Sequence, residues 1–483
     1  MRTLIQGGWV VGFDGNGHRL IPNGTVVFED DRILHVGHHF EEAVDRTIDA
    51  RGKLISPGLI NCHLHAAVNA SQTTLIADDG KLDYFGSNFI GYAFPRVDAK
   101  GPSKLSDPSL AATYGIWSAL RGGATTILDV GGMPGGRDAF TETVGKLGVR
   151  AYLGLGFRSA EYRFEGDRIR WIWDEAKGTD GLALAIDYVK KYDGTHNGRI
   201  RAMLYPGQLD TCTLDLLRAA RRAADELDVP MQLHAAMNLR EFHKILEQHG
   251  KTPIDLLHSI GFLKPRTGLG HCVFHNRHSW CHYPYVDDLE MLADSGATVV
   301  HAPYKYAKMG ITFESFARYR AAGINIAIGT DTYPQDMINE MRWAALMTRM
   351  ADENFTAGKP RDVFDAATLG GAAHLGRDDL GRLTAGAKAD IIVVDLQQVH
   401  YGAIYDPIAS LIECGSGSDV EMVIVDGEIL VENGKAVRFD ESALLRDVQA
   451  EGEGMWNRVP EWHWSGKKID EIVPMSYPVV CRG

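Results

Sequence analysis

The middle of this chain repeats one pattern: a short apolar segment of strand character is followed by a longer segment whose apolar residues recur at helical spacing, as in residues 214–227 and 287–295. Repeated units of this kind predict an α/β fold with a parallel sheet. Eight of them predict a closed (β/α)8 TIM barrel, with its active site at the C-terminal ends of the strands. The predicted strands are 54–65, 125–132, 150–157, 199–207, 230–236, 268–274, 297–303 and 325–332.

Both ends of the chain are predicted to form short strands separated by turn residues, a pattern that differs from the alternation of strands and helices in the middle. We therefore predict a smaller composite β-sandwich domain built from both ends, with the barrel inserted between them. The long aromatic-bearing segment 69–107 does not fit the repeat and is predicted to be a functional lid. The expected divisions are sandwich 1–55, barrel 56–380, sandwich 381–440 and a C-terminal tail 441–483.

Composition narrows the class of partner. Lys and Arg total 50 against 63 Asp and Glu, a net charge of −13, which disfavours nucleic acid and anionic membranes and favours a small neutral or cationic substrate. The six cysteines form no CxxC pair, and no signal-length or membrane-length apolar run occurs. These features predict neither a disulfide framework nor membrane insertion, and they favour a cytoplasmic protein.

Polar side chains stand where the predicted barrel strands end. His63 and His65 close the first strand, and because side chains alternate along a strand, both imidazoles point to the same side. Imidazole is a ligand for zinc, iron, nickel and copper. A single histidine on an apolar strand is more often structural, but a set at several strand ends favours a metal site. The other members of the set are His234, His271, His301 and Asp331.

Six short motifs follow one another along most of the chain, from residue 56 onward. They are SPGLINCHLH at 56–65, GATTILD at 123–129, GHC at 270–272, VHAP at 300–303, GTD at 329–331 and ADIIVVD at 389–395. In this combination the sequence resembles the amidohydrolase superfamily, in the branch that contains cytosine deaminase and the triazine hydrolases. The resemblance covers roughly residues 1 to 440.

The resemblance implies a ligand set and a metal count. In such enzymes the metal is held by the residues that match His63, His65, His234 and Asp331, while the match to His271 contacts the metal-bound water or the substrate. Binuclear relatives carry a carboxylated lysine on the fourth strand, where this chain reads AMLYPG at 202–207. One divalent ion per chain is therefore expected, zinc before iron, cobalt or manganese, and the resemblance also implies a homo-oligomer.

The chain departs from its branch at two places. Relatives carry a glutamate three residues after the fifth-strand histidine, which protonates a ring nitrogen of the substrate, but this chain has Met237. Glu241 and His243 follow too late and are expected to begin the next helix. After the seventh strand, relatives often have Ser-Asn where this chain has Lys305, which either steers a substrate carbonyl or is a solvated loop residue.

These features together predict a mononuclear metal-dependent amidohydrolase that cleaves a C–N bond of an amide, urea or carbamate-like molecule with metal-activated water, as phenylurea and thiocarbamate hydrolases do. In this hypothesis His271 polarises the carbonyl and Asp331 carries the proton to the leaving amine. His301, Met237 and Lys305 are the predicted substrate-binding residues. The alternatives are a deaminase or dechlorinase of a nitrogen heterocycle and, in another class, a non-catalytic scaffold.

Overall fold

The computed structural model describes residues 1–67, 107–132, 135–165, 168–314, 316–462 and 465–480. The predicted lid at 69–107 lies outside the described residues except for Asp107.

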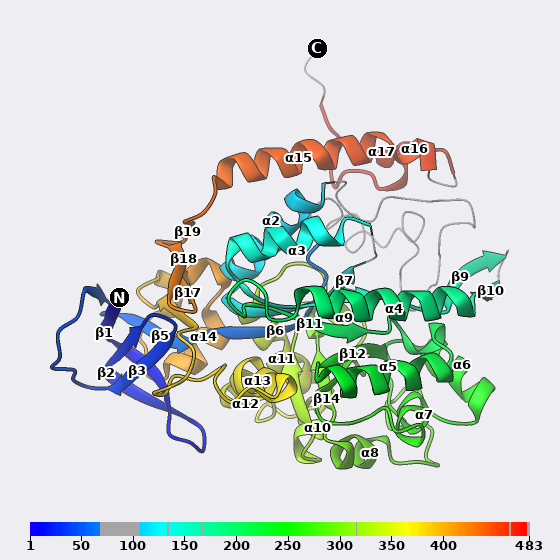
Figure 1. The fold of residues 1–483 in the computed structure, drawn as a ribbon, viewed down its shortest axis with the longest axis horizontal. Coiled ribbons are helices and arrows are strands. Elements are labelled where there is room, and N and C mark those ends of the chain that lie inside the picture. The colour runs from blue at the N-terminus through cyan, green and yellow to red at the C-terminus, as the bar shows by residue number, and fades with distance from the viewer. Residues whose placement is uncertain (68–106, 133–134, 166–167, 315, 463–464, 481–483) are drawn as a thin grey trace.

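An eight-stranded parallel sheet forms the centre of the molecule and confirms the predicted barrel (Figure 1). Neighbouring strands pair in sequence order from β6 to β15. The strands are β6 (Leu59–Leu64), β7 (Ala124–Gly132), β8 (Arg150–Gly156), β11 (Ile200–Tyr205), β12 (Met231–Ala235), β13 (Thr267–His271), β14 (Thr298–His301) and β15 (Asn325–Ile328). β9 (Ala160–Glu165) and β10 (Arg168–Trp173) form a separate hairpin after β8.

The first and last strands meet at one residue, Asp331. Its backbone N–H donates to the carbonyl of His63 at 2.8 Å, and its carbonyl accepts from the N–H of His65 at 2.8 Å. These two bonds join the end of β6 to the segment after β15. The barrel therefore closes at the point where three of the predicted ligands lie.

Helices surround the strands because their apolar residues fall on one face. In α5, Leu216, Leu217 and Ala220 are buried against the barrel, and the Thr213 side chain caps the first turn by accepting from the Leu216 N–H. The helices that follow the strands are α2 (Pro108–Arg121), α3 (Arg137–Leu147), α4 (Glu175–Tyr192), α5 (Leu214–Leu227), α6 (Leu239–His249), α7 (Pro253–Ser259), α8 (Asp288–Ser295), α9 (Pro303–Lys308), α10 (Phe316–Ala321), α11 (Met337–Ala351), α12 (Pro360–Asp365) and α13 (Gly371–Leu375).

A second sheet joins the two ends of the chain, at the left of Figure 1. β5 is paired with β1 on one side and, antiparallel, with β16 on the other, so N-terminal and C-terminal strands share one hydrogen-bonded layer. This confirms the composite domain. Its strands are β1 (Arg2–Phe13), β2 (His18–Glu29), β3 (Arg32–Gly37), β4 (Arg46–Asp49), β5 (Lys53–Pro57), β16 (Ile391–Asp395), β17 (Val420–Val425), β18 (Glu428–Glu432) and β19 (Lys435–Ala436).

The prediction of one strand over 54–65 is wrong, because the segment divides between the two sheets. β5 ends at Pro57 and belongs to the composite sheet, whereas β6 starts at Leu59 and belongs to the barrel. Pro57 has no N–H to continue a ladder. A Cβ at Gly58 would lie 2.0 Å from Thr125 Oγ1, so only glycine leaves room for the Thr125 side chain at this point.

The remaining helices cover the outside of the molecule. α14 (Pro407–Cys414) lies between β16 and β17 in the chain, and α15 (Glu441–Asn457) packs against α2 at the top of Figure 1. α16 (Val459–Trp462) and α17 (Ile469–Ile472) follow it. Within the described residues, none of these helices has the length and apolar character needed to cross a bilayer.

Candidate metal centre

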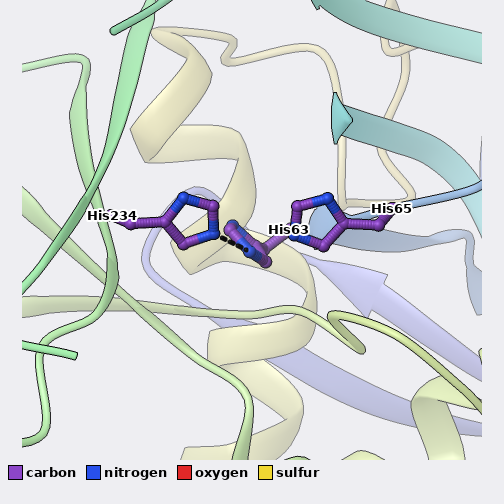
Figure 2. A group of neighbouring side chains, drawn as sticks. All are labelled: His63, His65 and His234. Carbon is purple, nitrogen blue, oxygen red and sulfur yellow. Dashed lines mark hydrogen bonds between the residues drawn. The ribbon is translucent and has the colours of Figure 1, made fainter. Parts of the chain in front are cut away.

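Three imidazoles converge at the C-terminal end of the barrel. His63 and His65 come from the end of β6 and its following residue, and His234 comes from β12 (Figure 2). Their ligand nitrogens lie within 4.8 Å of one another, and the Nε2 atoms of His63 and His234 are 3.1 Å apart. The alternation of side chains along β6 thus brings both of its histidines to one point.

Two further predicted residues complete this cluster. His271 ends β13, and with His63 and Asp331 it forms a second group whose ligand atoms lie within 4.8 Å of one another. Asp331 Oδ1 lies 3.4 Å from His65 Nε2, and Asp331 Oδ2 lies 3.5 Å from His271 Nε2. His271 and Asp331 are both fully buried.

The partners behind the ring nitrogens determine which nitrogen carries the proton. Gln232 donates its amide N–H to the Cys62 carbonyl at 2.8 Å, so its Oε1 faces His63 Nδ1, 2.5 Å away, and accepts from it. His234 Nδ1 lies 3.1 Å from the Gly207 carbonyl, which can only accept, and 2.8 Å from the Tyr205 hydroxyl, which can accept or donate. The Nε2 of His63 therefore presents a lone pair toward His234 Nε2, 3.1 Å away (dashed in Figure 2), where it can accept an N–H or bind a cation.

Burial keeps these imidazoles neutral, as metal ligands must be. It lowers the pKa of His63 and His65 to about 4 and that of His234 to about 3. Burial alone would raise the pKa of Asp331, but Lys305 and the surrounding histidines hold it well below its ordinary value. Neutral histidines and an ionised carboxylate fit a divalent cation that prefers nitrogen and oxygen ligands.

Lys305 is not a solvated loop residue. It lies in α9, its side chain is only 14% exposed, and its Nζ is 2.6 Å from Asp331 Oδ2. A positive charge therefore stands beside the ligand cluster. The helix begins at Pro303, directly after β14, and this turns Lys305 back toward the strand ends.

Met237 lies in the loop after β12, and Glu241 lies in the first turn of α6, directly beside that loop. The Glu241 carboxylate accepts the backbone N–H groups of Ala236 at 2.7 Å and Met237 at 3.1 Å. Burial raises the pKa of Glu241 to about 8, but both of its oxygens are engaged by the loop backbone. Glu241 and His243 lie in α6 as predicted, and Met237 is buried.

His301 ends β14 but belongs to neither ligand group. Its ring is 1% exposed and packs edge-on against Phe313, with 4.3 Å between ring centroids, and tilted against Phe316 at 5.6 Å. Its substrate-binding role stays a prediction.

Sequence reasoning did not single out Gln232 and Tyr205, which support the cluster. Tyr205 ends β11, and its hydroxyl is 2.8 Å from His234 Nδ1. Gln232 precedes His234 by two positions, so strand alternation places both side chains on the same side of β12. That spacing was the available signal for Gln232, whereas the signal for Tyr205 was its position at a strand end.

The chain matches a family model described as the amidohydrolase family over residues 54–430. It is 30% identical over 443 residues to a 5'-deoxyadenosine deaminase of Methanosarcina mazei, covering 91% of this chain and 95% of that one. It is also 30% identical over 433 residues to a 5-methylthioadenosine/S-adenosylhomocysteine deaminase of Halobacterium salinarum, covering 88% and 92%.

Solved structures share the fold. An adenosine deaminase from Xanthomonas campestris with bound zinc superposes with a TM-score of 0.78 at 22% identity, covering 94% of this chain and 98% of that one. A mutant atrazine chlorohydrolase from Arthrobacter aurescens, complexed with zinc and atraton, superposes with a TM-score of 0.78 at 24% identity, covering 93% and 100%.

Proposed function

This chain belongs to the amidohydrolase family and hydrolyses carbon–nitrogen bonds other than peptide bonds, and from this premise we propose that its substrate is an amide, urea or carbamate-like small molecule. The proposal includes one divalent metal per chain, zinc in the first place, held by His63, His65, His234 and Asp331. The lone pair of His63 Nε2, the convergence of the ligand atoms and the charge of Asp331 support this ligand set.

Each residue of the cluster has a role in this reaction. When bound, the metal supplies a water whose pKa is lowered toward about 7. Asp331 takes a proton from the attacking water and passes it to the leaving nitrogen as the carbon–nitrogen bond breaks. His271, neutral because burial lowers its pKa, donates a hydrogen bond to the carbonyl oxygen. Lys305, Met237 and His301 are the proposed substrate contacts.

One observation favours carbonyl substrates: among the described residues, the loop after β12 offers no free carboxylic acid. Met237 has no proton to give, and Glu241 is bound to the backbone of that loop. Protonating an aromatic ring nitrogen needs a general acid, which typically contributes about 10²- to 10⁴-fold in rate. Expelling an amine from a tetrahedral carbon needs only the proton that Asp331 has already taken.

The second candidate is deamination of an adenosine-like nucleoside. The 30% identity to a 5'-deoxyadenosine deaminase over most of both chains favours it. In that case the ring proton must come from a group other than residue 237.

A substrate panel separates the two candidates. Purified zinc-loaded protein is incubated with an aryl amide, a phenylurea and a carbamate, and in parallel with 5'-deoxyadenosine, cytosine and an aminotriazine, with amine and ammonia release as readouts. We expect amine release from the first set, lost in Asp331→Asn. Ammonia release from the second set alone would establish the deaminase instead. Elemental analysis is expected to give one zinc per chain, and two required metals would contradict the ligand assignment.

The composition of the chain also bears on its cellular location and its partners. The net charge of −13 and the cysteine pattern suit a cytoplasmic protein with a small-molecule partner and no nucleic-acid or membrane partner. A homo-oligomer is proposed by analogy with the family, and sedimentation analysis of the purified protein tests it.

A further inference from the structure

A buried ion pair lies directly beside His65, outside the ligand cluster. Asp129 is on β7, opposite Leu64 in the barrel register, and Arg137 is the first residue of α3. The Arg137 Nη1 donates to Asp129 Oδ2 at 2.5 Å, and the two side chains are 4% and 1% exposed. We propose that this pair positions His65 for metal binding, an inference that rests on the metal centre proposed above but not on its substrate.

The second oxygen of Asp129 makes the connection to the ligand. Asp129 Oδ1 accepts the backbone N–H of Ala66 at 2.9 Å, and Ala66 directly follows His65. The carboxylate thus fixes the peptide unit on one side of the ligand, while the bond from the His65 N–H to the Asp331 carbonyl fixes the other. His65 is the partly exposed member of the cluster, with 17% of its side chain accessible, so it has the greatest need of such support.

The backbone of β7 at Gly131 lies close to both the His65 imidazole and the Asp129 carboxylate. A Cβ at Gly131 would lie 3.2 Å from His65 Nδ1 and 3.5 Å from Asp129 Oδ1. The imidazole of His65 and the carboxylate of Asp129 therefore lie against the same residue of the strand. Arg137 is itself held in place, because its guanidinium stacks on Phe140 at 4.8 Å.

Stability alone does not explain this pair. The desolvation of two buried charges offsets most of their attraction, and apolar residues of similar volume often stabilise a fold equally well. An apolar side chain at position 129, however, leaves the Ala66 N–H without its acceptor. The geometry therefore assigns to Asp129 a positioning role, with Arg137 holding the carboxylate in its orientation.

The test measures metal affinity, by competition with a chromogenic chelator for Zn²⁺, and unfolding by urea of the metal-free protein. In Asp129→Asn the amide cannot accept from both Ala66 and Arg137, so we expect zinc affinity to fall by about 10- to 100-fold. In Asp129→Asn/Arg137→Met no arginine competes for the asparagine oxygen, so this oxygen can accept the Ala66 N–H. We expect the zinc affinity to return to within about threefold of wild type. A merely structural role predicts no such rescue.

The matched control is another buried pair, Arg150 with Asp390, which joins β8 to the residue before β16 through bonds of 2.8 and 3.0 Å. Asp390→Asn is expected to weaken folding and leave zinc affinity unchanged. Should Asp129→Asn fail to fold, Asp129→Leu/Arg137→Met is compared with Asp129→Asn/Arg137→Met, and the leucine variant is expected to bind zinc about tenfold more weakly or worse.

Two results overturn the proposal: Asp129→Asn that binds zinc like wild type, or a double variant that binds no better than Asp129→Asn. In the fallback comparison, equal affinities of the leucine and asparagine double variants overturn it. If wild-type protein itself binds no zinc, the metal centre proposed above fails and this inference fails with it.

Discussion

Replacing Gln232 by leucine removes two buried hydrogen bonds at once. The side chain is fully buried, and it joins His63 Nδ1 at 2.5 Å to the Cys62 carbonyl at 2.8 Å. Each buried partner left unsatisfied costs about 1–3 kcal/mol, so the metal-free variant is expected to lose about 2–6 kcal/mol of stability. Losing the group that orients a ligand histidine lowers metal affinity by about 10- to 100-fold, which corresponds to about 1.4–2.7 kcal/mol.

Urea unfolding of metal-free protein measures the first quantity, and chelator competition for Zn²⁺ measures the second. The control is Asn325→Leu, because Asn325 lies at the opposite end of the barrel and donates to Thr298 Oγ1 at 2.9 Å and to the Gly370 carbonyl at 3.0 Å. This variant is expected to lose stability and keep wild-type zinc affinity. Equal zinc affinities of Gln232→Leu and wild type would refute the argument that Gln232 sets the His63 tautomer.

Four more outcomes are expected. Lys305→Met removes the charge that lowers the pKa of Asp331, so the acid limb of the kcat/KM profile moves to higher pH; an unmoved limb contradicts this. Met237→Glu does not speed amide or urea hydrolysis in a rate assay, because that reaction needs no ring protonation. Metal-free protein is less stable to urea at pH 5 than at pH 7: the unfolded histidines titrate near their ordinary pKa of about 6.5 while the buried ligands resist protonation, costing roughly 2 kcal/mol each at pH 5. Truncation at residue 380 removes β16 from β5 and gives insoluble protein, as a solubility assay of the expressed fragment measures.

The sequence allowed the barrel and the ligand cluster to be predicted because both follow from local periodicity. The spacing of His63 and His65 on a strand determines their common direction, and parallel strands bring their ends together without further information. The position of Lys305 could not be predicted, since it depends on how α9 turns back after β14. The Asp129–Arg137 pair was also missed: Asp129 ends the motif at 123–129, but nothing in that motif indicates that its carboxylate accepts the N–H of Ala66 and pairs with Arg137.

Because the chain passes from the composite sheet to the barrel at Gly58, the strands of the composite sheet are synthesised in two separate periods. β5 leaves the ribosome with β1, but its other neighbour, β16, begins roughly 330 residues later. At synthesis rates of about 5–20 residues per second, that interval lasts roughly 15 to 70 seconds. Throughout it β5 lacks its partner on that side, while the barrel strands β6 to β15 are synthesised. The composite sheet is thus the later of the two sheets to be completed, and until then its open edge is exposed to pairing with other chains.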